Sequence, residues 1–202
     1  MRLIPIWQAD LHKAYDLQMS FPKNENGFEN TAFGQTLEQF AVYVKCREER
    51  SRSVGLPEGY VPDTVYVLED DQGNYVGIFN LRHYLNDALR NGAGHIGYGI
   101  RKEYRGKGYA SAGLALVLEE ARKIVPEEEI YFSVDKDNPA SLKVQLKNGA
   151  RIDHENETEY FTRIELISKQ FLDLTLCNSA NGGKACIYGL FRHLLYGRTI
   201  RI

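Results

Sequence analysis

The chain has 202 residues, which is enough for one domain with a sizeable hydrophobic core and a short appendage. Its composition, 43% hydrophobic and 26% charged with a formal net charge of −2, is ordinary for a globular protein and gives no basic field that would draw it to nucleic acid or an anionic membrane. The apolar runs are too short for a signal peptide or a membrane span. The cysteines, Cys46, Cys177 and Cys186, form no CxxC pair, so we expect a reduced, cytoplasmic setting, and we expect no bound metal.

The first half of the chain alternates helical and extended patterns. Apolar residues one turn apart predict a short helix within 9–21, and a second helix follows the N-cap candidate Thr36. The stretch 22–36, rich in Asn, Gly and Glu, is predicted to be a loop. Residues 64–85 then predict two strands joined by a tight turn at 71–74.

The second half predicts strand, helix, strand and helix in succession, followed by two strands. The expected elements are a strand over 95–101, a helix over 108–124, a strand over 129–137, a helix over 138–150 and a pair of strands within 151–167. Strands and helices in this mixed order indicate an α/β layered domain, which we place at 1–166.

The remaining segment, 167–202, is expected to be a C-terminal extension. It has more cationic than acidic residues: Lys169, Lys184, Arg192, Arg198 and Arg201 against Asp173. Such a segment covers an apolar edge of its own domain, or it is an arm that meets a second copy in a homodimer. We favour the packing element.

The stretch "RGKGYA" places glycines where an extended pattern gives way to a helical one. The first turn of a helix has N–H groups without intrahelical partners and a partly positive end. Because Gly106 and Gly108 lack side chains and Ala110 has a small one, an anion can approach these amides closely. Arg105 and Lys107 add positive charge beside them. The stretch is therefore built as a cradle for a diphosphate.

This segment resembles the pyrophosphate signature of the GNAT N-acetyltransferase superfamily, Gln/Arg-x-x-Gly-x-Gly/Ala. Residues 105–110 fulfil every fixed position, and the Asn-x-x-Ser that members often carry after the next strand is matched by Asn138 and Ser141. The order of elements agrees across 1–166, and parts of the chain look like a bacterial subgroup of predicted acetyltransferases. The resemblance implies a single-domain, mixed, mostly antiparallel twisted sheet flanked by helices.

The resemblance also implies which residues bind acetyl-CoA, the co-substrate. The backbone of two residues on the strand before the motif would pair with the pantetheine amides, the motif amides would hold the pyrophosphate, and the asparagine and serine would lie at the pantetheine. These cofactor-binding candidates are Tyr98, Ile100, Arg105, Gly106, Lys107, Gly108, Tyr109, Ala110, Asn138 and Ser141. The thioester would point into a gap between the strands 95–101 and 130–135.

A purely structural interpretation accounts for some of the same residues. "RGKGYA" is also a plausible strand-to-helix turn without a ligand. Asn138 followed by Pro139 is a complete N-cap with proline at the first helical position, a role that is compatible with a cofactor contact.

The residues that would move protons follow the family pattern less closely. Many members have a tyrosine seven residues after the motif asparagine, to protonate the departing thiolate, but here that position is Gln145, which has no titratable proton. The catalytic candidates are Tyr98, then His83, then His95. In the predicted strand 95–101, Tyr98 points to the face expected of a catalytic side chain, whereas strand alternation turns His95 to the other face. His83 lies on the preceding strand.

The sequence therefore predicts an enzyme that moves the acetyl group of acetyl-CoA to a primary amine, by direct attack in a ternary complex. A small-molecule amine is the expected acceptor. Two alternatives stay open: a catalytically silent acyl-CoA-binding module, which the glutamine at 145 favours, and a protein-interaction domain on the same fold. The substitution Gly108→Asp is the test that separates these alternatives from the enzyme, since it should abolish acetyl-CoA binding if the main hypothesis holds.

Overall fold

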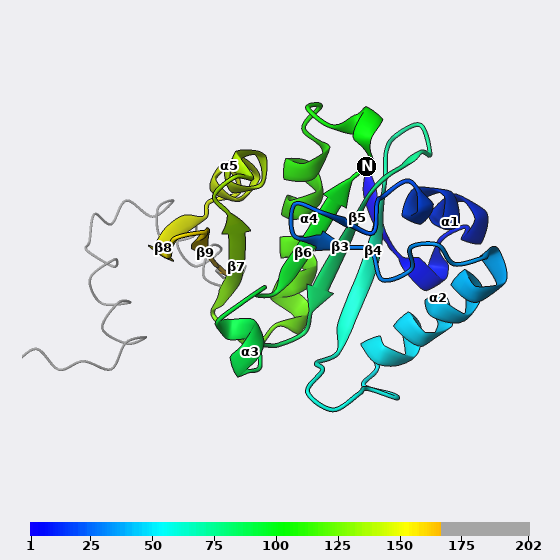
Figure 1. The fold of residues 1–202 in the computed structure, drawn as a ribbon, viewed down its shortest axis with the longest axis horizontal. Coiled ribbons are helices and arrows are strands. Elements are labelled where there is room, and N and C mark those ends of the chain that lie inside the picture. The colour runs from blue at the N-terminus through cyan, green and yellow to red at the C-terminus, as the bar shows by residue number, and fades with distance from the viewer. Residues whose placement is uncertain (167–202) are drawn as a thin grey trace, which may run out of the picture. The chain divides into compact units, whose positions relative to one another are not determined.

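The computed structural model describes residues 1–166, and the predicted C-terminal extension lies outside the described residues. Residues 1–166 form one compact unit of strands and helices (Figure 1). In chain order the elements are β1 (Arg2–Pro5), the 3-10 helix η1 (Ile6–Gln8), α1 (Leu11–Met19), β2 (Asn24–Glu25), β3 (Phe28–Glu29), α2 (Leu37–Ser51), β4 (Asp63–Glu69), β5 (Tyr75–Arg82), α3 (Asp87–Arg90), β6 (Ile96–Ile100), the 3-10 helix η2 (Lys102–Tyr104), α4 (Tyr109–Ile124), β7 (Glu129–Asp135), α5 (Pro139–Lys147), β8 (Arg151–Glu155) and β9 (Glu159–Glu165).

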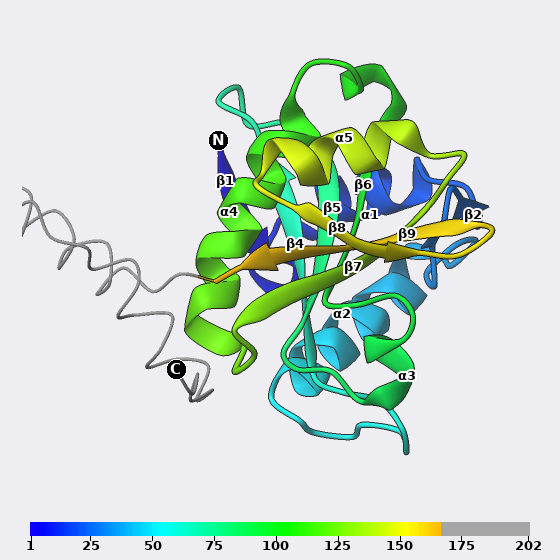
Figure 2. The same ribbon diagram turned by 90° about the vertical axis from the view of Figure 1, so that its left-hand side faces the viewer.

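The longer strands form two sheets. One has four strands in the order β1-β4-β5-β6, and the other has three in the order β7-β9-β8. Every strand pairing within the described residues is antiparallel. In Figure 2 the three-stranded sheet and α5 face the viewer. The α/β class and the mostly antiparallel, helix-flanked sheet predicted from the sequence are confirmed.

The four-stranded sheet is covered on both faces, because β4 is apolar on both. Val65 and Val67 pack with α1 and α2, while Tyr66 and Leu68 pack with α4 on the opposite face. Figure 1 shows α1 and α2 on one side of β4 and β5. Successive side chains of a strand point to opposite faces, so the nearly unbroken apolar run of β4 indicates a strand buried on both sides.

Two helices begin at side-chain caps that the sequence predicted. At α2, Thr36 Oγ1 accepts from the Gln39 amide at 3.3 Å and Gln39 Oε1 accepts from the Thr36 amide at 2.9 Å, a reciprocal capping box. At α5, Asn138 Oδ1 accepts from the Ser141 amide at 3.1 Å. Each cap satisfies amides that the first helical turn leaves unpaired.

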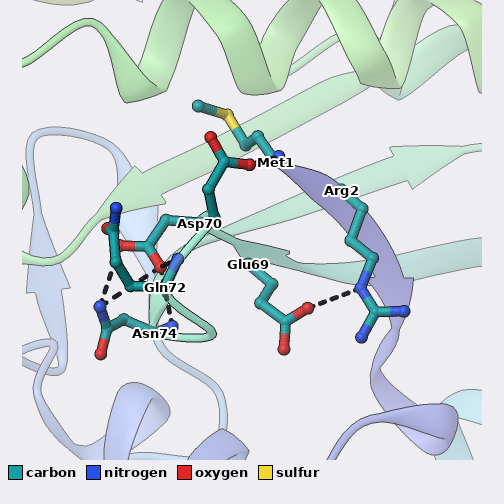
Figure 3. Close-up of polar contacts among 7 residues, drawn as sticks. Met1, Arg2, Glu69, Asp70, Gln72 and Asn74 are labelled. Carbon is teal, nitrogen blue, oxygen red and sulfur yellow. Dashed lines mark hydrogen bonds and ion pairs between the residues drawn. The ribbon is translucent and has the colours of Figure 1, made fainter.

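The predicted tight turn joins β4 to β5 and also holds the N-terminus (Figure 3). Asp70 Oδ1 accepts from the Gln72 amide at 2.9 Å and from the Asn74 amide at 2.8 Å. The Met1 amino group pairs with Asp71. In the neighbouring pair β1–β4, Arg2 Nε lies 2.5 Å from Glu69 Oε2. The turn therefore fixes the edge strand as well as its own hairpin.

The structure has several short elements that the sequence pattern did not predict. They are β1, the two-residue strands β2 and β3 inside the predicted loop, α3 within 86–94, and the 3-10 helices η1 and η2. All are short, so each contains too few residues to show a helical or strand periodicity in the sequence. The β2–β3 hairpin is held by residues outside it instead, since Glu25 pairs with Arg105 and Phe28 packs on Phe21 at 5.2 Å between ring centroids. None of the helices in residues 1–166 is both long and apolar enough to cross a membrane.

Candidate active site

The two sheets meet at one point and then separate. His95, immediately before β6, donates its amide to the Tyr131 carbonyl at 2.8 Å, and the Tyr131 amide donates to His95 Nδ1 at 3.0 Å. Beyond this junction β6 and β7 belong to different sheets. The predicted gap between the two strands therefore opens on the Tyr98 side of His95.

His95 stabilises this junction from inside the protein. Its side chain is fully buried, with 0% exposed. Since Nδ1 accepts from Tyr131, the neutral ring carries its proton on Nε2, which lies 3.4 Å from Glu127 Oε2. Burial lowers the pKa of His95 to about 4, although Glu127 acts in the opposite direction. The residue does not line the cleft described below, so the geometry favours a structural role.

The free edge of β6 presents backbone groups to the gap. The His95 carbonyl accepts from the Arg82 amide at 2.8 Å, and the Arg101 amide donates to the Val76 carbonyl at 2.9 Å. In an antiparallel ladder bonded residues alternate, so the amide and carbonyl groups of Tyr98 and Ile100 face away from β5. This is the orientation that the predicted pantetheine contacts require. The Ile100 carbonyl already accepts from Arg105 Nε at 2.8 Å.

The motif "RGKGYA" forms the entry to α4. Gly108 is the N-cap residue, with a left-handed φ of +87° and no side-chain cap. Gly106 has a φ of +75°, and a Cβ at either glycine would meet no atom within 4 Å. Free space therefore lies beside both glycines, which fits an anion approaching the first amides of α4. Lys107 Nζ lies 5.4 Å from the Tyr104 ring centroid beside them.

A cleft of about 880 Å³ extends from this gap over the face of the four-stranded sheet beneath α2. Of the sequence candidates, Tyr98, Asn138 and Ser141 line it. The Tyr98 hydroxyl lies 2.7 Å from Ser141 Oγ, and its ring stacks on Phe79 at 5.5 Å between centroids. Burial raises the pKa of Tyr98, while hydrogen bonding to Ser141 and Gln145 lowers it in part.

Gln145, at the position where a tyrosine is often found, also lines the cleft. It is 2% exposed, and its Oε1 accepts from Thr162 Oγ1 at 2.7 Å. The side chain is therefore held by β9. Asn138 combines its cap with a second contact, since Nδ2 lies 3.4 Å from the Asn26 carbonyl at the tip of the β2–β3 hairpin. The hairpin thus approaches the start of α5 at the mouth of the gap.

The sequence of residues 8–151 matches the family of the acetyltransferase (GNAT) domain. This match spans most of the chain. The protein belongs to the GNAT acetyltransferase family. A comparison with curated protein sequences finds no match.

Solved structures share the GNAT fold at low identity. The spermidine N-acetyltransferase of Vibrio cholerae, solved with CoA and spermine, has a TM-score of 0.54 and 19% identity over 82% of this chain and 95% of its own. RimJ of Mycobacterium smegmatis, solved with CoA-disulfide, has a TM-score of 0.57 and 20% identity over 81% of this chain and 80% of its own. PseH of Campylobacter jejuni, solved with acetyl coenzyme A, has a TM-score of 0.53 and 11% identity over 81% and 97%. These likenesses establish the fold.

In this GNAT fold the sequence candidates separate into two groups. Tyr98, Asn138 and Ser141 line the cleft and the free edge of β6 faces the gap, whereas the motif forms the start of α4 and does not line the cleft. His83 does not line the cleft; its Nε2 lies 2.9 Å from Thr64 Oγ1, and burial lowers its pKa. Of the three catalytic candidates, only Tyr98 faces the cleft.

The sequence analysis did not single out the charged residues of the cleft. Arg47, Arg50, Asp63 and Arg82 line it from α2, β4 and β5. Their one sequence signal is local: Arg47 and Arg50 are three residues apart, so they share a helix face. Because their partners are distant in sequence, only the fold shows that they form a cluster.

Proposed function

We propose that this protein is an acetyl-CoA-dependent N-acetyltransferase that acts on the primary amine of a small molecule by direct attack in a ternary complex. One observation carries the proposal. The uncapped, glycine-lined start of α4 lies at the end of a strand whose free edge faces a gap between two sheets. A diphosphate fits the start of α4, and a peptide-like arm with amide groups fits the free strand edge.

The chain's own residues would divide the binding of acetyl-CoA as follows. The backbone amides from Gly106 to Ala110 would bind the pyrophosphate. Lys107 and Tyr109 would contribute through their backbone amides. The Tyr98 backbone and the Ile100 amide would pair with the pantetheine arm. The Ile100 carbonyl would keep its bond to Arg105, which holds the motif against β6.

The bound co-substrate supplies an acetyl thioester, whose carbonyl carbon gains a bond to the amine nitrogen and loses its bond to sulfur. We assign Tyr98 the role of proton donor to the sulfur. Burial raises the pKa of its phenol, so the proton is present at neutral pH. The amine must lose a proton to attack, and the cleft offers the carboxylates of Glu29, Asp135 and Glu159 as acceptors.

The binding half of the proposal is tested by calorimetric titration with acetyl-CoA. Gly108→Asp puts a side chain and a negative charge into the cradle, so binding should be lost. Gly34→Asp is the matched control, because Gly34 also has a positive φ, +77°, and no atom within 4 Å of a Cβ, and it lies outside the cleft. Undiminished binding by Gly108→Asp would refute the proposed cradle.

Gln145 supports one second candidate, an acyl-CoA-binding module without transfer. The side chain has no titratable proton and is held by Thr162. Thiol release from acetyl-CoA in the presence of primary amines separates the two functions. Turnover that depends on the amine supports the transferase; binding of acetyl-CoA with no release above the uncatalysed rate supports the module.

A further inference from the structure

Three arginines and one aspartate gather where the cleft passes beneath α2. Arg47 and Arg50 come from α2, whereas Asp63 and Arg82 stand opposite each other in the β4–β5 ladder. Arg47 Nη2 donates to Asp63 Oδ2 at 2.5 Å, and Arg50 Nε lies 3.9 Å from Asp63 Oδ1. All four residues line the cleft. We call them the arginine cluster.

The arginine cluster has an excess of positive charge. Three guanidinium groups share one carboxylate, which leaves a net charge of +2. Its remaining contacts are neutral: Arg82 Nη1 donates to the Gly94 carbonyl at 2.9 Å, and Arg47 Nη2 lies 3.4 Å from Asn80 Oδ1. The desolvation of these guanidinium groups is therefore only partly offset by Asp63.

The cluster also has unused hydrogen-bonding capacity. Arg47 is only 7% exposed, yet its Nε has no hydrogen-bond partner among the described residues. Arg50 Nε is buried and has no hydrogen-bond partner there either. Asp63 Oδ1, 3.9 Å from Arg50 Nε, also has no hydrogen-bond partner there. A buried donor without an acceptor is destabilising, so the two arginines, Arg47 above all, favour an acceptor that enters the cleft.

The arginines are held in place for such an acceptor. The Arg47 guanidinium lies 5.7 Å from the Tyr43 ring centroid, and that of Arg50 lies 5.1 Å from the Tyr60 centroid. Both tyrosines line the cleft. Guanidinium groups fixed over aromatic rings lose less conformational freedom when they bind carboxylate or phosphate oxygens.

Other parts of the cleft have the opposite charge. Glu29, Asp135 and Glu159 line it from β3, β7 and β9, and no arginine or lysine from those strands lines it. Between the two charged regions lies Gly97 on β6, where a Cβ would meet no atom within 4 Å, so the β6 wall is open there. The cleft thus suits a molecule with a cationic end and an anionic end.

We infer that the acetyl acceptor is an amine that also carries a carboxylate or phosphate group, which Arg47, Arg50 and Arg82 bind. The inference rests on the proposed function and specifies the substrate class of that same site. The anion occupies the arginine cluster, and the amine lies toward the gap, where its nitrogen forms the amide bond as the carbon–sulfur bond breaks and the thiolate takes up a proton.

The test compares amines of equal length with and without an anionic group. Thiol release from acetyl-CoA is measured with ω-amino acids against n-alkylamines, and with aminoalkyl phosphates against amino alcohols. Spermidine is the cationic comparison. The anionic member should have a kcat/KM about tenfold or more above its neutral partner. The carboxylate and phosphate series show which anion the cluster selects. Equal rates within each pair, or fastest transfer to spermidine, would overturn the inference.

The variant Arg50→Gln tests the cluster directly. Arg50 is the more exposed α2 arginine of the cluster, at 23% of its side chain against 8% for Arg47, so the fold should tolerate the change. It should abolish most of the preference for the anionic amine over its neutral partner. Arg52→Gln is the matched control at the C-cap of the same helix, since Arg52 is 67% exposed, pairs with Glu48 and lies outside the cleft.

The same samples separate this inference from the proposed function. Both variants and the unmodified protein should bind acetyl-CoA equally in a calorimetric titration. If the unmodified protein binds no acetyl-CoA, the proposed function fails, and the inference fails with it. If amines are acetylated with no preference for an anionic group, or Arg50→Gln retains the preference, the inference alone is overturned.

Discussion

The hydroxyl of Tyr98 on β6 lies 2.7 Å from Ser141 Oγ on α5. This bond crosses from the four-stranded sheet to the helix that begins at the mouth of the gap. It fixes the one titratable side chain among the sequence candidates that faces the cleft. The phenol is therefore buried and held by a hydrogen bond, as the proposed proton donor requires.

Tyr98→Phe should lower kcat about 100-fold if the phenol protonates the departing sulfur. The phenylalanine ring keeps the stack on Phe79, so the KM for acetyl-CoA should change little. Steady-state thiol release with acetyl-CoA and amine varied in turn measures both constants. Ser141→Ala, which keeps the phenol and removes its partner, should have a smaller effect. An unchanged kcat in Tyr98→Phe would exclude the phenol as the donor.

Glu25→Gln should affect the cleft more than the stability of the fold. Glu25 forms a two-bond pair with Arg105, at 3.1 and 2.5 Å, and so holds the β2–β3 hairpin that lines the cleft. Removing an exposed ion pair should change the free energy of unfolding by less than about 1 kcal/mol. The loosened hairpin should raise the KM for the amine about threefold or more.

The matched control for this change is Glu103→Gln. Glu103 pairs with Arg101 at 2.6 Å in the same part of the chain, and neither residue lines the cleft. Denaturant unfolding and amine-dependent thiol release are measured on both variants. A KM for the amine that stays constant in Glu25→Gln would show that the hairpin does not shape the acceptor site.

Much of the cofactor side of the site could be predicted, because its signals are local. The glycines at 106 and 108 adopt the left-handed backbone that most other residues rarely adopt, and Asn138 is followed by proline, so both features are visible within a few residues. The acceptor side could not be predicted in this way. Arg47 meets Asp63 only when α2 packs on β4, and no short stretch of sequence records that contact.

The histidines illustrate the same limit. A histidine on a strand before the motif is a reasonable candidate base, because its ordinary pKa is close to neutral. Whether it can act as a base depends on how deeply it is buried. Strand alternation indicates only that its side chain points to one of the two faces of the sheet, not what covers that face. The fold buries His95 against Glu127 and Tyr131 and pairs His83 with Thr64.

The buried His95 should make stability depend on pH. Its pKa is about 4 in the folded protein against 6.5 for an ordinary histidine, so the unfolded chain binds the proton more readily. Stability from this residue is fully present above pH 6.5 and falls as the pH drops toward 4. The loss between pH 7 and pH 5 should be about 2 kcal/mol. Glu127 opposes the shift, whereas Arg90 and Arg82 add to it.

Urea unfolding of His95→Asn measures this contribution. The asparagine oxygen can accept from the Tyr131 amide in place of Nδ1, so the strand junction is kept while the titrating group is removed. The difference in unfolding free energy between the unmodified protein and the variant should shrink by about 2 kcal/mol from pH 7 to pH 5. His12→Asn, at an exposed histidine, is the control. A difference that stays constant across this range would contradict a neutral, buried His95.

Gly113→Ala should destabilise the protein, although alanine is the better helix former by about 1 kcal/mol. Gly113 lies inside α4, and a Cβ there would come 2.3 Å from Phe79 Cζ and 2.9 Å from Leu68 Cδ2. Because Phe79 is fully buried, its ring cannot move away freely. Overpacking of this kind costs ~1–3 kcal/mol, so the net effect should be a loss of about 1 kcal/mol and a fall of a few degrees in Tm.

The double variant Gly113→Ala/Phe79→Leu shows whether the ring causes this loss. The shorter side chain leaves room for the new methyl group, so Gly113→Ala should be much less destabilising in the Phe79→Leu background than alone. Ser111→Ala, in the same helix, is the control for helix propensity. Since Tyr98 stacks on Phe79, Gly113→Ala alone should also lower kcat by displacing the phenol. Equal losses in both backgrounds would show that Phe79 does not set the packing limit at Gly113.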